Sequence, residues 1–199
     1  MIKIISEYCE ENKLTINRKK TKCLIFNKTG RLIREQFHLN GNLLENVREY
    51  KYLGFIFTLS GEIGTGLQDL TNRAFKAIQA IKGKMGGSFN SDVVTALSLY
   101  DSLIKPILTY ASDFWGSLKL PNHNPIEVLQ MKVFKQILGV QTQTTNIGVF
   151  LELGRSPLDI ECIKLAVKNW ERIRKGEAND ILVESYNCLL YTSPRPRDS

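Results

Sequence analysis

The sequence is poor in the side chains and patterns that most enzymes use for hydrolysis or redox chemistry. It has only two histidines, His38 and His123, and its four cysteines form no CxxC pair. This spacing argues against a structural zinc site, which needs four converging nitrogen or sulfur ligands. The motifs GxSxG, HExxH, GxGxxG and the Walker A loop are missing, which argues against the enzyme classes that use them. No two aspartates are adjacent, so a two-metal carboxylate site has no obvious ligands.

Long hydrophobic runs are missing as well. No window holds eighteen consecutive apolar residues, so no membrane span is predicted. The opening residues MIKIISEYCEENK lack the apolar core and cleavage site of a secretory signal. We therefore expect buried free thiols in a reducing, intracellular compartment, with nucleus and cytoplasm both open.

What the sequence does have is an excess of basic charge. The 199 residues include 27 Lys and Arg against 20 Asp and Glu, a net charge of +7. Residues 1–60 hold 11 of the basic and 6 of the acidic residues, with a maximum at residues 18–22, RKKTK. Lys19, Lys20 and Lys22 could bind phosphates, or they could be a solvated connection between a helix and a strand.

The hydrophobic pattern predicts an α+β fold, with a small antiparallel β hairpin region followed by an all-helical bundle. Before residue 60 we expect a helix over 1–11, strands at 23–26 and 49–58, and a hairpin within 36–45 around Asn40-Gly41. Gly54 would mark a bulge or a close backbone approach in its strand. After residue 61 we expect helices over 67–85, 91–104, 125–138 and 157–174, with a connector at 144–153.

Three further expectations concern side chains of the helical part of the chain. Arg73, Lys76 and Lys84 fall within an arc of about 80° at 100° per residue, which could follow a nucleic-acid backbone or be an ordinary wet face. Pro106 should break or kink its helix. Four aromatic residues are predicted to lie in the core: Tyr110, Phe114, Trp115 and Trp170.

Several motifs occur in an order that resembles a known family. They are N-x-x-K-T at 17–21, Tyr52-Leu53-Gly54, P-I-L-x-Y-x-S-x-x-W-G at 106–116 and LELGRSPL at 151–158. Together they resemble the C-terminal part of the reverse transcriptase of non-LTR (LINE-type) retrotransposons, over about residues 1–175. Each motif is weak alone, and the series is fairly specific.

The resemblance implies a division of the chain and a truncated polymerase. Residues 1–60 would be the end of the palm with a primer-grip-like hairpin, 61–116 the thumb, and 117–176 the following helical region. The catalytic Y-x-D-D, which precedes N-x-x-K-T in the family, is absent here. A truncated RNA-directed DNA polymerase of this kind would keep at most non-specific binding to an RNA template and DNA primer. Its fingers, most of its palm and the Mg²⁺ of the intact enzyme would be missing.

The candidate nucleic-acid contacts follow from the basic residues and the family assignment. Tyr52 and Gly54 rest on the motif alone; the full set is Lys19, Lys20, Lys22, Tyr52, Gly54, Arg73, Lys76 and Lys84. We expect no catalytic residue and no metal ligand in this chain. The alternatives are a non-enzymatic nucleic-acid-binding or interaction module, or an inert pseudogene product.

The end of the chain is treated separately. Residues 177–199 form a tail, and its last part, 188–199, reads CLLYTSPRPRDS. This segment resembles the translation of a sequencing adapter and continues no helical pattern. We therefore expect it to be adapter-derived and to lie outside the native fold; the alternative is a disordered tail rich in Pro, Arg and Ser.

Overall fold

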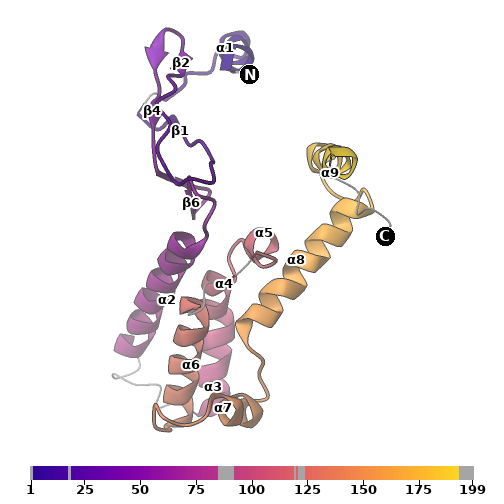
Figure 1. Ribbon diagram of the computed structural model, residues 1–199. Coiled ribbons are helices and arrows are strands. Elements are labelled where there is room, and N and C mark those ends of the chain that lie inside the picture. Colours follow the sequence, from indigo (N-terminus) through magenta and orange to yellow (C-terminus); the bar gives the residue numbers. More distant parts are fainter. Residues whose placement is uncertain (1, 18, 85–91, 119, 121–123, 193–199) are drawn as a thin grey trace. The chain divides into compact units, whose positions relative to one another are not determined.

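The computed structural model of the chain describes residues 2–17, 19–84, 92–118, 120 and 124–192. The chain divides into two compact units, Met1–Asn72 and Arg73–Ser199. Figure 1 shows the order of the elements.

The first unit contains one helix, three pairs of short strands and the start of a second helix. Its elements are α1 (Ile2–Glu11), β1 (Lys22–Cys23), β2 (His38–Leu39), β3 (Asn42–Leu43), β4 (Glu45–Asn46), β5 (Glu49–Tyr52) and β6 (Phe55–Thr58). Helix α2 (Gly64–Lys84) begins here and ends in the second unit. Strands β1 and β4 pair in parallel, while β2 with β3 and β5 with β6 form antiparallel hairpins. The predicted strand at 23–26 is therefore shorter and begins one residue earlier.

The turn chemistry decides where the hairpins lie. Asn40 and Gly41 have φ of 49° and 75°, as the two central residues of the predicted hairpin turn require. The prediction of one strand over 49–58 is wrong, because Leu53 and Gly54, at φ of 46° and 86°, turn the chain between β5 and β6. Gly54 is thus a turn residue rather than a bulge.

A buried ring fixes the start of α2. Phe55 is buried, and its ring lies where a side chain on Gly66 would have to be. A glycine at this position lets the first turn of α2 lie directly against β6. Leu67 and Leu70, one turn further along, are fully buried.

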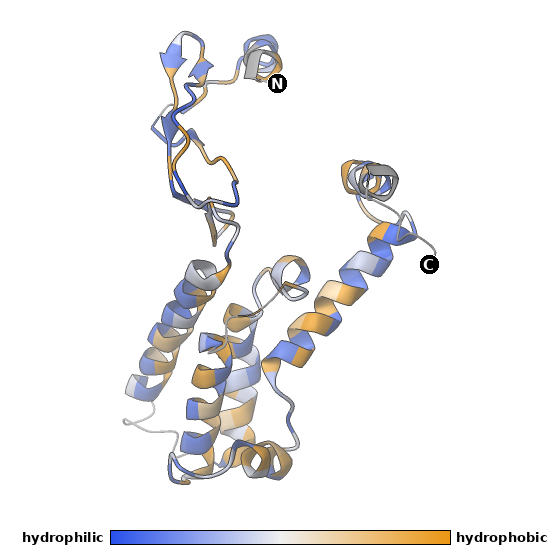
Figure 2. Cartoon of the chain, in the orientation of Figure 1, coloured by the Kyte–Doolittle hydropathy of each residue, from blue (hydrophilic) through white to orange (hydrophobic). Residues whose placement is uncertain are grey.

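Among its described residues the second unit contains helices joined by turns, and its long helices carry both hydrophobic and hydrophilic residues (Figure 2). Its elements after α2 are α3 (Val93–Leu99), the π-helical segment η1 (Tyr100–Ile104), α4 (Lys105–Leu108), α5 (Ser112–Trp115), α6 (Pro125–Leu138), α7 (Asn146–Leu153), α8 (Leu158–Arg174) and α9 (Asp180–Thr192). Helices α3 and α6 lie side by side, and α7 contacts α6 (Figure 1).

The helix that contains Pro106 continues past it. Asp92 caps the start of α3, because its carboxylate accepts a hydrogen bond of 2.7 Å from the amide of Thr95. The chain then widens into η1, where the amide of Lys105 bonds to the carbonyl of Tyr100, five residues back. A π turn just before Pro106 accommodates its missing N–H, so α4 extends to Leu108. Of the two predicted effects of Pro106, the break is therefore wrong and the kink stays a prediction.

The Trp-Gly pair at the end of the third motif joins α5 to α8. Trp115 is fully buried, as predicted, and its indole N–H donates to the carbonyl of Tyr110 at 2.8 Å. A side chain on Gly116 would overlap the backbone carbonyl of Cys162 on α8. The glycine therefore permits the close approach of these two helices.

Several helix predictions are confirmed and others need correction. The helices over 125–138 and 157–174 occur as α6 and α8, and Gly139 and Gly176 end them with positive φ. The connector at 144–153 is instead mostly helical, as α7. Residues 188–192 continue α9, so this part of the tail is helical, contrary to prediction, whereas 193–199, like Met85 and Ser91, lie outside the described residues.

Three predicted core aromatics are exposed. Trp170, Tyr110 and Phe114 each leave between 42% and 53% of their surface accessible. Trp170 packs edge-on against Tyr186 of α9, and the guanidinium of Arg174 lies 5.4 Å from the ring centre of Trp170.

Of the four cysteines only Cys162 is buried, and burial raises the pKa of its thiol to about 11.

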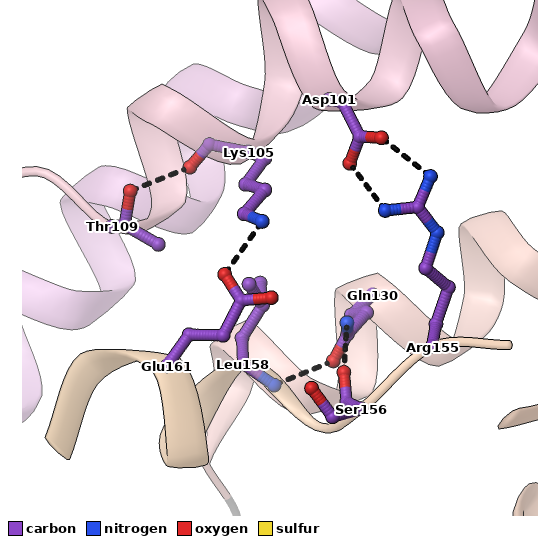
Figure 3. Close-up of polar contacts among 8 residues, drawn as sticks. All are labelled: Asp101, Lys105, Thr109, Gln130, Arg155, Ser156, Leu158 and Glu161. Carbon is purple, nitrogen blue, oxygen red and sulfur yellow. Dashed lines mark hydrogen bonds and ion pairs between the residues drawn. The ribbon is translucent and has the colours of Figure 1, made fainter. Parts of the chain in front are cut away.

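A buried polar cluster holds the start of α8 against α6 and the η1–α4 segment (Figure 3). The amide of Gln130 is buried; it donates to the carbonyl of Ser156 at 3.2 Å and accepts from the amide of Leu158 at 3.0 Å. Arg155 forms a two-pronged ion pair with Asp101, at 2.6 and 3.3 Å. The fourth sequence motif therefore takes part in this cluster through Arg155, Ser156 and Leu158, and Asp101 lies five residues before the third motif.

Replacing Gln130 by alanine should lower the free energy of unfolding by about 2–4 kcal/mol. The change leaves the Leu158 amide and the Ser156 carbonyl without their partner and opens a cavity. Urea denaturation measures the loss. Gln136→Ala, on the exposed side of the same helix, is the matched control and should cost less than about 1 kcal/mol. Equal losses in the two variants would contradict a structural role for the Gln130 amide.

A second prediction concerns pH. Glu127 lies in the first turn of α6, where its carboxyl group is partly buried and hydrogen-bonded to Asp159 of α8. Burial and this neighbour raise the pKa of Glu127 to about 7. Because the unfolded pKa is near 4.3, this group stabilises the fold least when it is charged, so its contribution falls as the pH rises from about 4.5 through 7.

Glu127→Gln should therefore gain stability relative to the unchanged chain between pH 5 and pH 8, measured by urea denaturation at each pH. Glu171→Gln, an exposed change on α8, serves as the control. A stability difference for Glu127→Gln that does not vary with pH would show that the two carboxyl groups are not coupled in this way.

Candidate nucleic-acid interface

The N-x-x-K-T motif forms a hydrogen-bonded turn in the first unit. The backbone carbonyl of Asn17 accepts bonds from the amides of Lys20 and Thr21, at 3.1 and 3.0 Å. The hydroxyl of Thr21 donates to the same carbonyl at 2.9 Å. The Asn17 side chain accepts a further bond from the Lys20 amide. Asparagine and threonine thus close the turn through backbone groups, which explains why the motif needs these residue types.

This turn leaves two of its lysines facing solvent. Lys19 and Lys20 are exposed. The hydroxyl of Tyr50 on β5 donates to the carbonyl of Lys20 at 2.8 Å, which ties the turn to the β5–β6 hairpin. The two ammonium groups are carried on a backbone that local hydrogen bonds already fix.

The third lysine of the cluster is placed differently. Lys22 begins β1, is half-buried, and forms an ion pair with Glu45 of the adjacent strand β4. Its charge is therefore largely compensated within the fold. Among the described residues of the cluster, which leave out Arg18, two lysines face outward and one is paired with a carboxylate.

The candidate residues of the β5–β6 hairpin lie at or beside its turn. Tyr52 is 58% exposed and Leu53 74% exposed. Leu53 adopts a left-handed φ of 46°, unusual for a bulky residue, followed by Gly54 at 86°. The structure places Tyr52 and Gly54 on either side of Leu53 at an exposed turn.

The three candidate cations of α2, Arg73, Lys76 and Lys84, belong to the second unit and differ in their surroundings. The guanidinium of Arg73 lies 5.8 Å from the ring centre of Tyr110, so Arg73 takes part in packing within the unit. Lys76 and Lys84 are exposed. Of the predicted arc, two lysines are left on the solvent side.

One set of cations escaped the sequence analysis. Lys105 on α4 and Lys164 and Lys168 on α8 line a common cavity of the second unit. The two α8 lysines could have been found from the sequence, because Lys164, Lys168 and Arg172 are four residues apart and so share one helix face. Lys105 could not be added to them from sequence, since the fold of the 105–161 segment brings it there.

The described residues do not fit a two-metal site. No three metal-binding side chains come together in the described ranges. Asp69 and Asp101 are engaged in ion pairs with Lys51 and Arg155. A reaction step through Mg²⁺ therefore has no set of ligands among the described residues.

Among the described helices, none has both the length and the hydrophobicity of a membrane span.

Removing the Tyr50 hydroxyl should loosen the N-x-x-K-T turn. Tyr50→Phe deletes one hydrogen bond, worth about 1 kcal/mol, so tryptic cleavage after Lys19 and Lys20 should become about fivefold faster. Tyr52→Phe makes the same change two residues along β5, at an exposed hydroxyl, and should leave the rate unchanged. Equal rates in the two variants would mean that the Tyr50 contact does not hold the turn.

Comparison with known proteins finds two curated proteins that are similar to this chain. The probable RNA-directed DNA polymerase from transposon BS of Drosophila melanogaster is 25% identical over 134 residues, 67% of this chain. The RNA-directed DNA polymerase from mobile element jockey of Drosophila funebris is 28% identical over 135 residues, 68% of this chain. Each match spans 15% of the relative's own length.

No family model and no solved structure matches the chain. The two curated polymerases are nonetheless of the kind that the order of the motifs implies, and both align with about two thirds of the chain. The chain is thus similar in sequence to part of the RNA-directed DNA polymerases of non-LTR transposons.

Proposed function

We propose that this chain is the part of a reverse transcriptase that holds the backbone of the template–primer duplex. The relatives are RNA-directed DNA polymerases, and the chain corresponds to 15% of their length. In this proposal residues 1–60 are the end of the palm, 61–116 the thumb and 117–176 the following helical region. The observation that carries it is the hydrogen-bonded turn that presents Lys19 and Lys20 to solvent.

The chemistry of the turn suits a duplex of any sequence. A polymerase must hold its product without reading it, and lysine contacts to phosphate fix position while carrying no base information. Two ammonium groups on a fixed turn can meet backbone phosphates with little further ordering of the protein. Lys76 and Lys84 on α2 add exposed positive charge in the second unit.

The catalytic step is assigned to the rest of the polymerase. The sequence has no Y-x-D-D, and the carboxylates described above are engaged with cations of the fold. The two Mg²⁺ ions and their aspartate ligands would belong to the palm of a longer polypeptide. The proposed role of this chain is to bind and position nucleic acid.

Lys22 has a structural role in this proposal rather than a direct one. Its ion pair with Glu45 joins β1 to β4, just beyond the turn. A phosphate would have to compete with this carboxylate for the ammonium group. Lys19 and Lys20 are exposed and adjacent, so they are the better contacts.

The test is fluorescence anisotropy of the full chain with a labelled RNA–DNA hybrid over a salt series. Lys19→Gln/Lys20→Gln removes two phosphate contacts and should lower the slope of log K against log salt by about 2, with weaker binding at every salt concentration. Circular dichroism verifies that the variant is folded.

The matched control is Lys22→Gln/Glu45→Gln, which removes one internal ion pair and leaves the net charge unchanged. It should bind the hybrid as the unchanged chain does. Binding that is insensitive to salt, or a loss confined to the Lys22/Glu45 variant, would overturn the proposal.

A further inference from the structure

The second unit contains an open basic cavity between α4 and α8 that the sequence analysis did not identify. Its volume is about 550 Å³, within the range of ligand sites in proteins. Lys105 and Thr109 line it from the α4 side and Ser156 from the linker before α8; Glu161, Lys164, Leu165 and Lys168 line it from α8.

The charges in this cavity leave two lysines available. Lys105 is paired with Glu161 at 2.6 Å, so these two residues neutralise each other (Figure 3). Lys164 and Lys168 are exposed, and neither forms an ion pair with any residue that the structure describes. The one carboxylate that faces the cavity therefore does not cancel the charge of the α8 lysines.

The two lysines begin a basic stripe along α8. Lys164, Lys168 and Arg172 follow one another at intervals of four residues, which places them about 6 Å apart and within an arc of about 80°. All three are exposed. A row of evenly spaced cations suits a ligand whose negative charges also repeat along a line.

Hydrogen bonds within the protein hold two of the residues that line the cavity, Thr109 and Ser156. The hydroxyl of Thr109 donates to the carbonyl of Lys105 at 3.0 Å. The carbonyl of Ser156 accepts from the buried amide of Gln130, which also holds the first residue of α8. The two bonds of Gln130 hold the linker before α8 and the first residue of α8 against α6 (Figure 3), so a bound anion would meet a preorganised surface.

We propose that this cavity and the stripe that leads from it bind the phosphodiester backbone of a single nucleic-acid strand. Lys164 and Lys168 each contact one phosphate, and the strand continues along α8 toward Arg172. Leu165, 43% exposed at the cavity, offers an apolar surface for a sugar or base edge. The site lies in the second unit and is separate from the turn of Lys19 and Lys20, although its biological use rests on the proposed function.

The first test measures binding of a labelled oligouridylate to the full chain over a salt series. Lys164→Gln/Lys168→Gln should weaken binding several-fold at low salt and reduce the salt slope by about 1.4, since each contact to a single strand contributes about 0.7. Lys28→Gln/Arg34→Gln removes the same charge from exposed residues of the first unit and should change the slope little. Equal effects of the two variants, or no effect of the first, would overturn the proposal.

A second test locates the strand directly. A photo-crosslinking benzoylphenylalanine replaces Leu165 at the cavity or, as the control, Ile163, which is exposed to a similar degree but does not line the cavity. The oligouridylate should crosslink mainly at position 165. Equal crosslinking at both positions, or preference for position 163, would contradict the site. Displacement of the oligouridylate by polyglutamate at equal charge concentration would show instead a surface for acidic peptides.

These outcomes separate this inference from the proposed function. If the Lys19/Lys20 variant loses affinity for the hybrid while the Lys164/Lys168 variant binds the oligouridylate normally, the proposed function stands and the α8 site falls. The opposite pattern keeps the α8 site and removes the duplex contact at the turn.

Discussion

The buried amide of Gln130 is the contact on which the second unit depends most. It satisfies the carbonyl of Ser156 and the amide of Leu158 together, and so fixes where α8 begins. The ion pairs of Asp101 with Arg155 and of Lys105 with Glu161 lie beside it, where they are partly screened and add less than the buried amide does. With the start of α8 fixed, Gly116 can approach the Cys162 carbonyl, and Lys164 and Lys168 come to lie across from α4. A structural hydrogen bond in the core thereby determines the geometry of a surface site.

In the first unit, too, side-chain hydrogen bonds to backbone groups hold the structure. Its strands are two to four residues long, so short ladders contribute little by themselves. Side-chain bonds to backbone groups hold its loops instead, at Asn17, Thr21 and Tyr50 around the basic turn. Asn46 donates similarly to the carbonyls of Ile33 and Glu35. In both units polar side chains satisfy the backbone and leave selected lysines on the outside, an arrangement suited to a protein that binds a charged backbone.

The sequence predicts this structure best where local chemistry decides the outcome. The Asn40-Gly41 hairpin and the ends of α6 and α8 follow from turn residues and helix-ending glycines, and all were correctly predicted. Predictions failed where tertiary contacts decide. Trp170 and Tyr110 read as core residues but are exposed, because hydrophobicity alone does not reveal which helix face is covered. Lys22 looked equivalent to Lys20 until the pairing of β1 with β4 placed Glu45 beside it. Likewise, Lys105 and Lys164 are 59 positions apart in the sequence, so only the fold could bring them into one cavity.

We propose above all that this chain contacts the phosphate backbone of a nucleic acid and does not read its bases. The most direct measurement is the affinity of the full chain for two RNA–DNA hybrids of equal length and unrelated sequence, each over a range of salt concentrations. The account predicts equal affinities for the two hybrids and a steep, common decrease in log K with log salt, because both effects come from lysine–phosphate contacts. A marked preference for one sequence, or affinity that does not change with salt, would contradict it.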